Sequence, residues 1–152
     1  AERAQLIGAL LEDAPDAPRI GAWLYREGLI PGLILSSPAE RARETALKVC
    51  KGLDYSKRDI RWESSLYEAD LEGLLHVLAA QARGRLSILL VAHNPGLEAL
   101  LRYLTDGDLD EPNDGKLLPT AALARLEMPD DWRRLDAGCA NLLTLLRPKS
   151  LR

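Results

Sequence analysis

Residues 86–100 read Leu86-Ser87-Ile88-Leu89-Leu90-Val91-Ala92-His93-Asn94-Pro95-Gly96-Leu97-Glu98-Ala99-Leu100. The apolar run that opens this stretch has the length and the Leu, Ile and Val content of a strand that is buried on both faces. It ends at His93, and Asn94 and Pro95 then have the residue types of a helix cap and a first helical position. This order predicts a strand that feeds a helix, with His93 at the carboxyl edge of a parallel sheet, where open α/β sheets bind ligands. Because the helix aims free backbone N–H groups and its positive dipole end at the same space, we expect an anion site there.

The composition excludes several classes of protein. Hydrophobic residues make up 47% and charged residues 28% of the 152 residues, which is ordinary for one soluble domain, expected over residues 1–152. A net charge of −3 argues against non-specific binding to nucleic acid, which needs a basic face. No apolar run has membrane-spanning length and no signal peptide is visible, so we expect a cytoplasmic protein with no membrane partner. Cys50 and Cys139 lie in apolar stretches and are expected to be reduced thiols in the core. We expect no metal and no cofactor.

Buried runs alternate with amphipathic stripes along most of the chain. The pattern predicts strands at residues 33–36, 86–92, 120–126 and 141–146, a weak strand at 60–62, and helices over 17–27, 39–51, 71–82 and 95–104. Gly52 is expected to end the second of these helices, and residues 5–11 fit either a helix or a short strand. The alternation predicts an α/β fold, a three-layer α/β/α sandwich around a mostly parallel sheet with right-handed crossovers.

A second strand-to-helix corner of the same design stands at residues 36–38. Ser37 and Glu40 have the spacing of a capping box, so Ser37 is expected to cap the helix that follows. If both strands are parallel, the two corners open on one edge of the sheet. Arg41, in the first turn of its helix, would then join His93 around an anion, since a guanidinium fork matches a phosphate bidentately. Considered alone, Arg41 fits a surface position and His93 a core position, so the prediction of a site depends on the pair.

The residues of both corners resemble the motifs of one family. Ser36-Ser37-Pro38-Ala39-Glu40-Arg41-Ala42-Arg43-Glu44-Thr45-Ala46 is similar to the signature S-S-P-x-x-R-A-x-x-T-A of the histidine phosphatase superfamily. Val91-Ala92-His93-Asn94-Pro95-Gly96 is similar to the second histidine motif of its small SixA-type phosphohistidine phosphatases. Residues 16–21, 118–124 and 145–148 resemble further stretches of the same family, in the same order. The resemblance covers about residues 14–151 and implies the phosphoglycerate mutase-like fold of that superfamily.

The resemblance implies a phosphatase of the SixA type that hydrolyses phosphohistidine or small phosphomonoesters. Arg41 would clamp the phosphoryl oxygens, and His93 would stabilise the charge of the transferring phosphoryl group. Glu68 would donate a proton to the leaving group, although it also fits an exposed position before a helix. Asn94 would cap its helix and touch the phosphate. The implied partner is a phosphorylated protein or a small phosphomonoester.

The chain departs from the family at the nucleophile. The family opens with a strand that ends in an Arg-His motif, whose His attacks phosphorus, and no such motif exists here. Either residues 5–11 take the place of that strand without its catalytic residues, or the sequence lacks a segment that the working protein has. His76 lies on the polar side of its predicted helix and is not expected to substitute. The hypotheses are therefore a SixA-type phosphatase that is active in a complete form, a non-catalytic phosphoryl-binding or protein-interaction module, and an unrelated α/β scaffold whose corners are only caps.

Overall fold

The protein is represented by a computed structural model, which describes residues 5–10, 17–81, 87–93, 96–105, 122–129 and 131–146. The strands are β1 (Gln5–Leu10), β2 (Leu33–Ser36), β3 (Ile60–Trp62), β4 (Ser87–Val91), β5 (Ala122–Glu127) and β6 (Asn141–Leu146). The α-helices are α1 (Ala17–Arg26), α2 (Glu40–Leu53), α3 (Leu71–Gln81) and α4 (Gly96–Leu104), and two short 3₁₀ turns are η1 (Lys57–Asp59) and η2 (Ser64–Leu66). In the described part of the chain, no helix is both long and apolar enough to cross a membrane.

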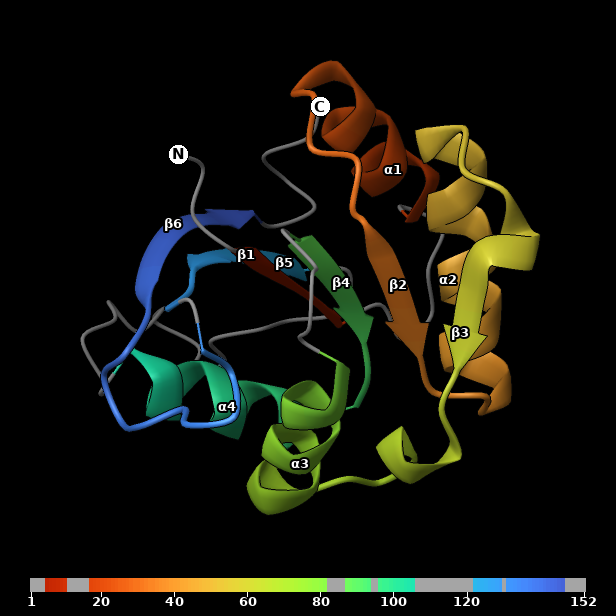
Figure 1. Cartoon of the computed structure of the whole chain (residues 1–152). Coiled ribbons are helices and arrows are strands. Elements are labelled where there is room, and N and C mark those ends of the chain that lie inside the picture. Colours follow the sequence, from red (N-terminus) through yellow and green to blue (C-terminus); the bar gives the residue numbers. More distant parts are fainter. Residues whose placement is uncertain are drawn as a thin grey trace, which may run out of the picture.

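The six strands form one sheet in the order β3-β2-β4-β1-β5-β6 (Figure 1). β1 pairs parallel with β4, β4 with β2, and β2 with β3, whereas β5 and β6 add an antiparallel edge. The predicted α/β sandwich with a mostly parallel sheet is confirmed, and every predicted strand and helix exists within two residues of its predicted bounds. The alternative left open for residues 5–11 is decided in favour of a strand, because β1 lies in the middle of the sheet between β4 and β5.

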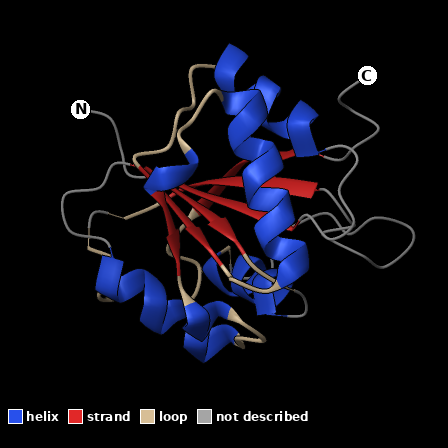
Figure 2. Ribbon diagram, turned by 90° about the vertical axis from the view of Figure 1, so that its right-hand side faces the viewer, coloured by secondary structure: helices blue, strands red, loops and turns tan. Residues whose placement is uncertain are grey.

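Helices cover both faces of the sheet, so each central strand divides its side chains between two cores (Figure 2). Ile34 of β2 and Leu89 of β4 pack with the apolar faces of α1 and α2. Leu35 and Leu90, one residue further along the same strands, pack with α3 and α4 on the opposite face. Successive side chains of a strand point to opposite faces, which is why these strands read as unbroken apolar runs in the sequence.

α1 and α2 pack closely at two glycines. A Cβ on Gly21 would overlap the carbonyl oxygen of Val49, and a Cβ on Gly52 would overlap that of Pro18. The prediction that Gly52 ends its helix is therefore wrong: Gly52 lies inside α2 because the backbone of α1 needs the space of a side chain. The helix ends one residue after Gly52, before Asp54, which takes the left-handed conformation at φ 58°.

The two cysteines are free thiols. Cys50 lies in the core between the sheet and α2, where burial raises the pKa of its thiol to about 11. Cys139 is half-buried, and burial also raises the pKa of this thiol above its ordinary range. The thiolate is the reactive form of cysteine, so neither side chain is activated for chemistry.

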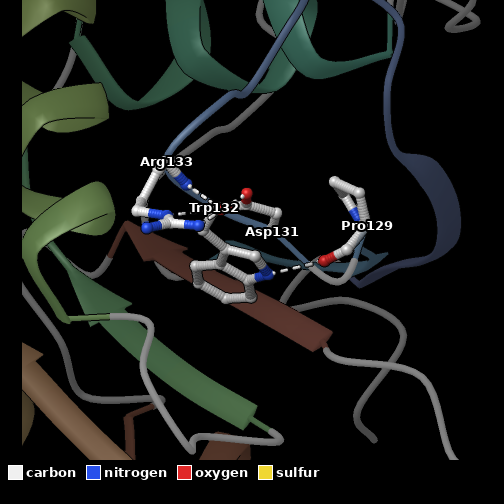
Figure 3. A network of polar contacts seen from close by, with 4 residues as sticks. All are labelled: Pro129, Asp131, Trp132 and Arg133. Carbon is white, nitrogen blue, oxygen red and sulfur yellow. Dashed lines mark hydrogen bonds and ion pairs between the residues drawn. The ribbon is translucent and has the colours of Figure 1, made fainter.

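The connection before β6 is held by one buried aromatic ring (Figure 3). Trp132 is 2% exposed, packs in the core under α3 and α4, and donates its indole N–H to the carbonyl oxygen of Pro129 at 2.8 Å. At the surface beside it, the guanidinium of Arg133 pairs with Asp131 at 3.0 Å and lowers the pKa of that carboxyl. The ring therefore fixes this connection from inside, and the exposed ion pair adds little to its stability.

Candidate functional site

The two corners identified in the sequence lie side by side at one edge of the sheet. β2 and β4 are neighbouring parallel strands, with Ser36 paired to Val91 at their ends. The N–H of Ser37 donates to the carbonyl oxygen of Val91 at 3.1 Å, which continues the pairing one residue past β2. In Figure 1 the arrowheads of β2, β3 and β4 point to this edge. Ser37 and His93 therefore lie next to each other at the carboxyl edge of the sheet.

A cavity of about 760 Å³ opens at this edge. Three of the four residues predicted for the site line it, namely Arg41, Glu68 and His93, although they come from three separate parts of the chain. The cavity is bounded by the start of α2, the segment between η2 and α3, the end of β4 and the start of α4. Its lining residues are Ala39, Glu40, Arg41, Tyr67, Glu68, Ala69, Asp70, Leu71, His93, Gly96 and Ala99.

The imidazole of His93 is held from two directions. Its Nε2 lies 2.9 Å from the Oγ of Ser37, which is fully buried. The ring of Tyr67 meets it edge-on, with the ring centroids 5.8 Å apart and the planes at 85°. The backbone of His93 is also fixed, because its carbonyl oxygen accepts the N–H of Leu97 at 2.9 Å in the hydrogen-bond pattern of a helix start. These contacts hold the ring in a defined orientation.

Ser37 is the residue of this site that sequence reasoning assigned to another role. It does not cap α2, which begins at Glu40 with Ala39 in the capping position and no side-chain cap. Its Oγ instead accepts the N–H of Ala39 at 3.3 Å and contacts His93. The predicted capping box is therefore wrong, since a hydroxyl already engaged by the neighbouring turn and by an imidazole does not reach the first turn of the helix. Only the motif S-S-P, present in the sequence, could have drawn attention to this residue.

Arg41 and Arg43 stand on the same helix but face different surroundings. Arg41 is exposed and lines the cavity, and among the described residues its guanidinium makes no hydrogen bond or ion pair. The guanidinium of Arg43 lies 5.8 Å from the centroid of the Trp62 ring, in a cation–π contact. Of these two arginines, Arg41 is therefore the one whose guanidinium N–H groups are available to a ligand in the cavity.

The segment before α3 forms the opposite wall of the cavity. Glu68 is exposed and has φ 53°, a conformation that costs a residue with a side chain some backbone strain. Asp70 accepts the N–H of Gly73 at 2.9 Å with its Oδ1 and so caps α3. Gly96, at the start of α4, allows this wall to come close, because a Cβ there would overlap the carbonyl oxygen of Ala69. The glycine of the second corner thus shapes the cavity.

The fourth predicted site residue, Asn94, lies outside the described residues, as does Pro95. Their predicted roles in capping α4 and touching a phosphate remain predictions. His76, the other histidine of the sequence, lies exposed on α3 and lines a different cavity of about 540 Å³, together with Arg133 and Asp136. His76 and His93 thus line different cavities.

The charges of the cavity decide what it can attract. Among the described residues, three carboxylates line it, on Glu40, Glu68 and Asp70, against the one guanidinium of Arg41. The electrostatic field of these four charged groups therefore does not favour an anion. An anion would have to be held by hydrogen-bond donors that point at it from short range. Among the described lining residues, the guanidinium of Arg41, the imidazole of His93 and the hydroxyl of Tyr67 can supply them. This arrangement suits one small tetrahedral anion better than a polyanion.

Known structures share this architecture. The protein histidine phosphatase SixA in complex with tungstate matches with a TM-score of 0.78 at 19% sequence identity, over 97% of this chain and 99% of that one. A protein assigned as SixA phosphohistidine phosphatase from Nakamurella multipartitia matches with a TM-score of 0.76 at 19% identity, over 97% and 98% of the two chains. The ecdysone phosphate phosphatase of Bombix mori, also in complex with tungstate, matches with a TM-score of 0.64 at 10% identity, over 96% and 93%.

No protein-family model and no curated protein sequence matches the chain. At these identities the structural similarity establishes the fold. The similarity extends over 97% of this chain and over 99% and 98% of the two SixA chains. The chain therefore has the fold of the histidine phosphatase superfamily, in its SixA-like form.

Proposed function

We propose that this chain binds the phosphoryl group of a phosphorylated protein or of a small phosphomonoester, in the cavity lined by Arg41 and His93. The observation that carries the proposal is that these two side chains, which come from different strand-to-helix corners, line one cavity at the carboxyl edge of the sheet. A cytoplasmic location is part of the same proposal.

The chemistry of the two groups fits a phosphoryl ligand. The guanidinium of Arg41 offers paired N–H donors that match two oxygens of a tetrahedral anion. The imidazole of His93 adds a donor whose direction is fixed by Ser37. Tungstate is a tetrahedral oxyanion like phosphate, and two of the proteins with a similar fold contain it, which supports an anion of this shape for the present cavity.

Binding without covalent turnover is the form of the proposal that we favour. A covalent phosphohistidine mechanism needs one imidazole as nucleophile in addition to the one that stabilises charge. The sequence has two histidines, and His76 lines a different cavity from His93. β1 holds a central place in the sheet and ends at Leu10, with no Arg-His motif at its end.

Hydrolysis of phosphohistidine or small phosphomonoesters is the second candidate. It is favoured by the presence of Glu68 in the lining of the cavity, where a carboxyl group could protonate a leaving group. It is also favoured by the activities named for the proteins with a similar fold. Among the described residues that line the cavity, His93 is the one histidine, so on this reading either His93 or a group other than histidine would attack phosphorus.

Titration with inorganic phosphate, followed by NMR of the two histidine side chains, tests the proposal. We expect the imidazole signals of His93 to shift in a saturable way, while those of His76 stay in place as an internal control. Thermal unfolding in the same series should show a rising Tm, because a ligand that binds only the folded state stabilises it. Equal shifts of both histidines, or no shift of either up to high phosphate concentration, would contradict a site at this cavity.

A further inference from the structure

The hydrogen bonds of Ser37 specify which nitrogen of His93 carries a proton. The Oγ of Ser37 accepts the N–H of Ala39 at 3.3 Å and lies 2.9 Å from Nε2 of His93. The adjacent Ser36 does not share this hydroxyl, since its own Oγ donates to the backbone carbonyl oxygen of Ser37 at 3.0 Å. Ser37 is fully buried, so water does not supply a partner for its hydroxyl hydrogen.

A serine hydroxyl has one hydrogen to donate and two lone pairs with which to accept. Within the described residues, Nε2 of His93 is the acceptor in reach of the Ser37 hydroxyl hydrogen. Leaving a buried donor unsatisfied is costly, so in the neutral ring the hydroxyl donates to Nε2. Nε2 is then unprotonated, and the ring hydrogen is on Nδ1, which has no hydrogen-bond partner among the described residues.

We propose that Ser37 is a positioning residue that keeps neutral His93 in the form protonated on Nδ1, so that the ring offers an N–H donor to a phosphoryl oxygen. The inference rests on the proposed function for its ligand, but the state of the ring can be measured without one. It gives His93 a role in anion binding at a pH where the ring carries no charge. Protonation of the ring does not remove this donor, because Nε2–H then donates to Ser37 and Nδ1–H stays in place.

The groups that surround His93 set the background for any pH dependence. Glu40 and Arg41 face the cavity from α2, and Tyr67, Glu68 and Asp70 face it from the segment before α3. The residues that α4 contributes, Gly96 and Ala99, carry no titratable group. These groups are unchanged when Ser37 is altered, so their titration affects the parent and a Ser37 variant alike.

Ser37→Ala removes the hydroxyl and frees the neutral ring to take the other tautomer. That tautomer turns a lone pair of Nδ1 toward the anion and would repel it. At about pH 8.5, where NMR verifies that the ring is neutral, the variant should bind inorganic phosphate about threefold to tenfold more weakly than the parent, because only the fraction of its rings with the proton on Nδ1 is competent. At a pH of about 5 at which NMR shows both ring nitrogens protonated in both proteins, the two affinities should agree within about twofold. The ratio of the two affinities at each pH cancels the change in the charge of phosphate itself.

Ser36→Ala is the matched control, because Ser36 is the same residue type, adjacent and equally buried, and its hydroxyl donates to the carbonyl oxygen of Ser37. Its phosphate affinity should stay within about twofold of the parent at both pH values. A loss in Ser37→Ala of the same size at both pH values would show a role in packing only and overturn the proposal. A similar loss in Ser36→Ala at high pH would overturn it as well.

Long-range ¹⁵N–¹H correlation NMR of the ligand-free parent at about pH 8.5 reads the ring directly. We expect the unprotonated nitrogen signal of His93 to belong to Nε2, and a mixture of the two tautomers in Ser37→Ala. A parent ring protonated on Nε2 would overturn the inference, whether or not Ser37→Ala folds. If the parent shows the Nδ1–H form but binds no phosphate, the proposed function fails and the positioning of His93 by Ser37 stands.

Discussion

Three neighbouring parallel strands end at the same edge of the sheet, and their ends differ in what they carry. β2 is followed by Ser37 and the helix of Arg41, and β4 is followed by His93. β1, next to β4, ends at Leu10, and the sequence continues Leu11-Glu12-Asp13 without an arginine or a histidine. The strand itself is needed by the fold, since it pairs with both β4 and β5. The comparison teaches that a sheet needs the pairing of a central strand even where the sequence that follows the strand has neither an arginine nor a histidine.

The largest expected effect concerns covalent turnover. Incubated with a labelled phosphodonor and quenched in alkali, where phosphohistidine survives, the 152-residue chain should retain no label. Loss of the nucleophile in a serine protease lowers turnover on the order of a millionfold, and we expect a loss of similar scale relative to an active phosphatase. Stoichiometric label on His93 or His76 would contradict this prediction, because it would show covalent turnover without a histidine at the end of β1.

The next largest effect concerns the corner that follows β2. Arg41→Ala should weaken the binding of inorganic phosphate about tenfold to a hundredfold, because a hydrogen bond to a charged group contributes about 1.5–3 kcal/mol. Isothermal titration measures the change. Arg43→Ala, on the same helix but in cation–π contact with Trp62, is the matched control and should bind as the parent does. Equal affinities of Arg41→Ala and the parent would remove Arg41 from the site.

The corner that follows β4 depends on a close backbone contact. Gly96→Ala places a Cβ against the carbonyl oxygen of Ala69, and we expect it to destabilise the protein by about 1–3 kcal/mol, the usual cost of overpacking. Chemical denaturation gives the free energy of unfolding. Gly73→Ala is the control, because its Cβ would meet the side chains of Ala69 and Asp70 at 3.3 and 3.4 Å, and small shifts relieve such contacts. If both variants have the stability of the parent, Gly96 does not shape the cavity.

The smallest effect concerns the charge of the opposite wall. Glu68→Gln removes an exposed carboxylate from the lining and should raise phosphate affinity about twofold to threefold, since exposed charges interact weakly across water. The gain should shrink at high salt, which screens the repulsion. Glu72→Gln changes a carboxylate on α3 that lines the other cavity and should leave the affinity unchanged. A fall in affinity for Glu68→Gln would mean that this carboxyl group contacts the ligand as a donor.

Local patterns predicted most of the secondary structure. The errors occurred at residues that contact a segment far away in the sequence. The strand at 33–36 was predicted to the residue because its side chains are all apolar up to the serine that ends it. Gly52 was misread as a helix end because the sequence does not show that α1 lies against it. Ser37 was misread as a cap because its partner, His93, is remote in the chain. Residues 5–11 stayed ambiguous because so short an apolar stretch satisfies the periodicities of both a helix and a strand.

By itself, the sequence determined the elements, the mostly parallel sheet and the two polar corners, because these follow from apolar periodicity and from the local preferences of proline, glycine and capping residues. The same reasoning named Arg41 and His93, and the resemblance to the histidine phosphatase superfamily added Glu68; all three line one cavity. Only the tertiary structure decided that β1 stands between β4 and β5, that Ser37 lies against Nε2 of His93, and that Gly96 admits the backbone of Ala69. These are contacts between segments far apart in the chain, and their distances are set by how the layers pack rather than by any local pattern of residues.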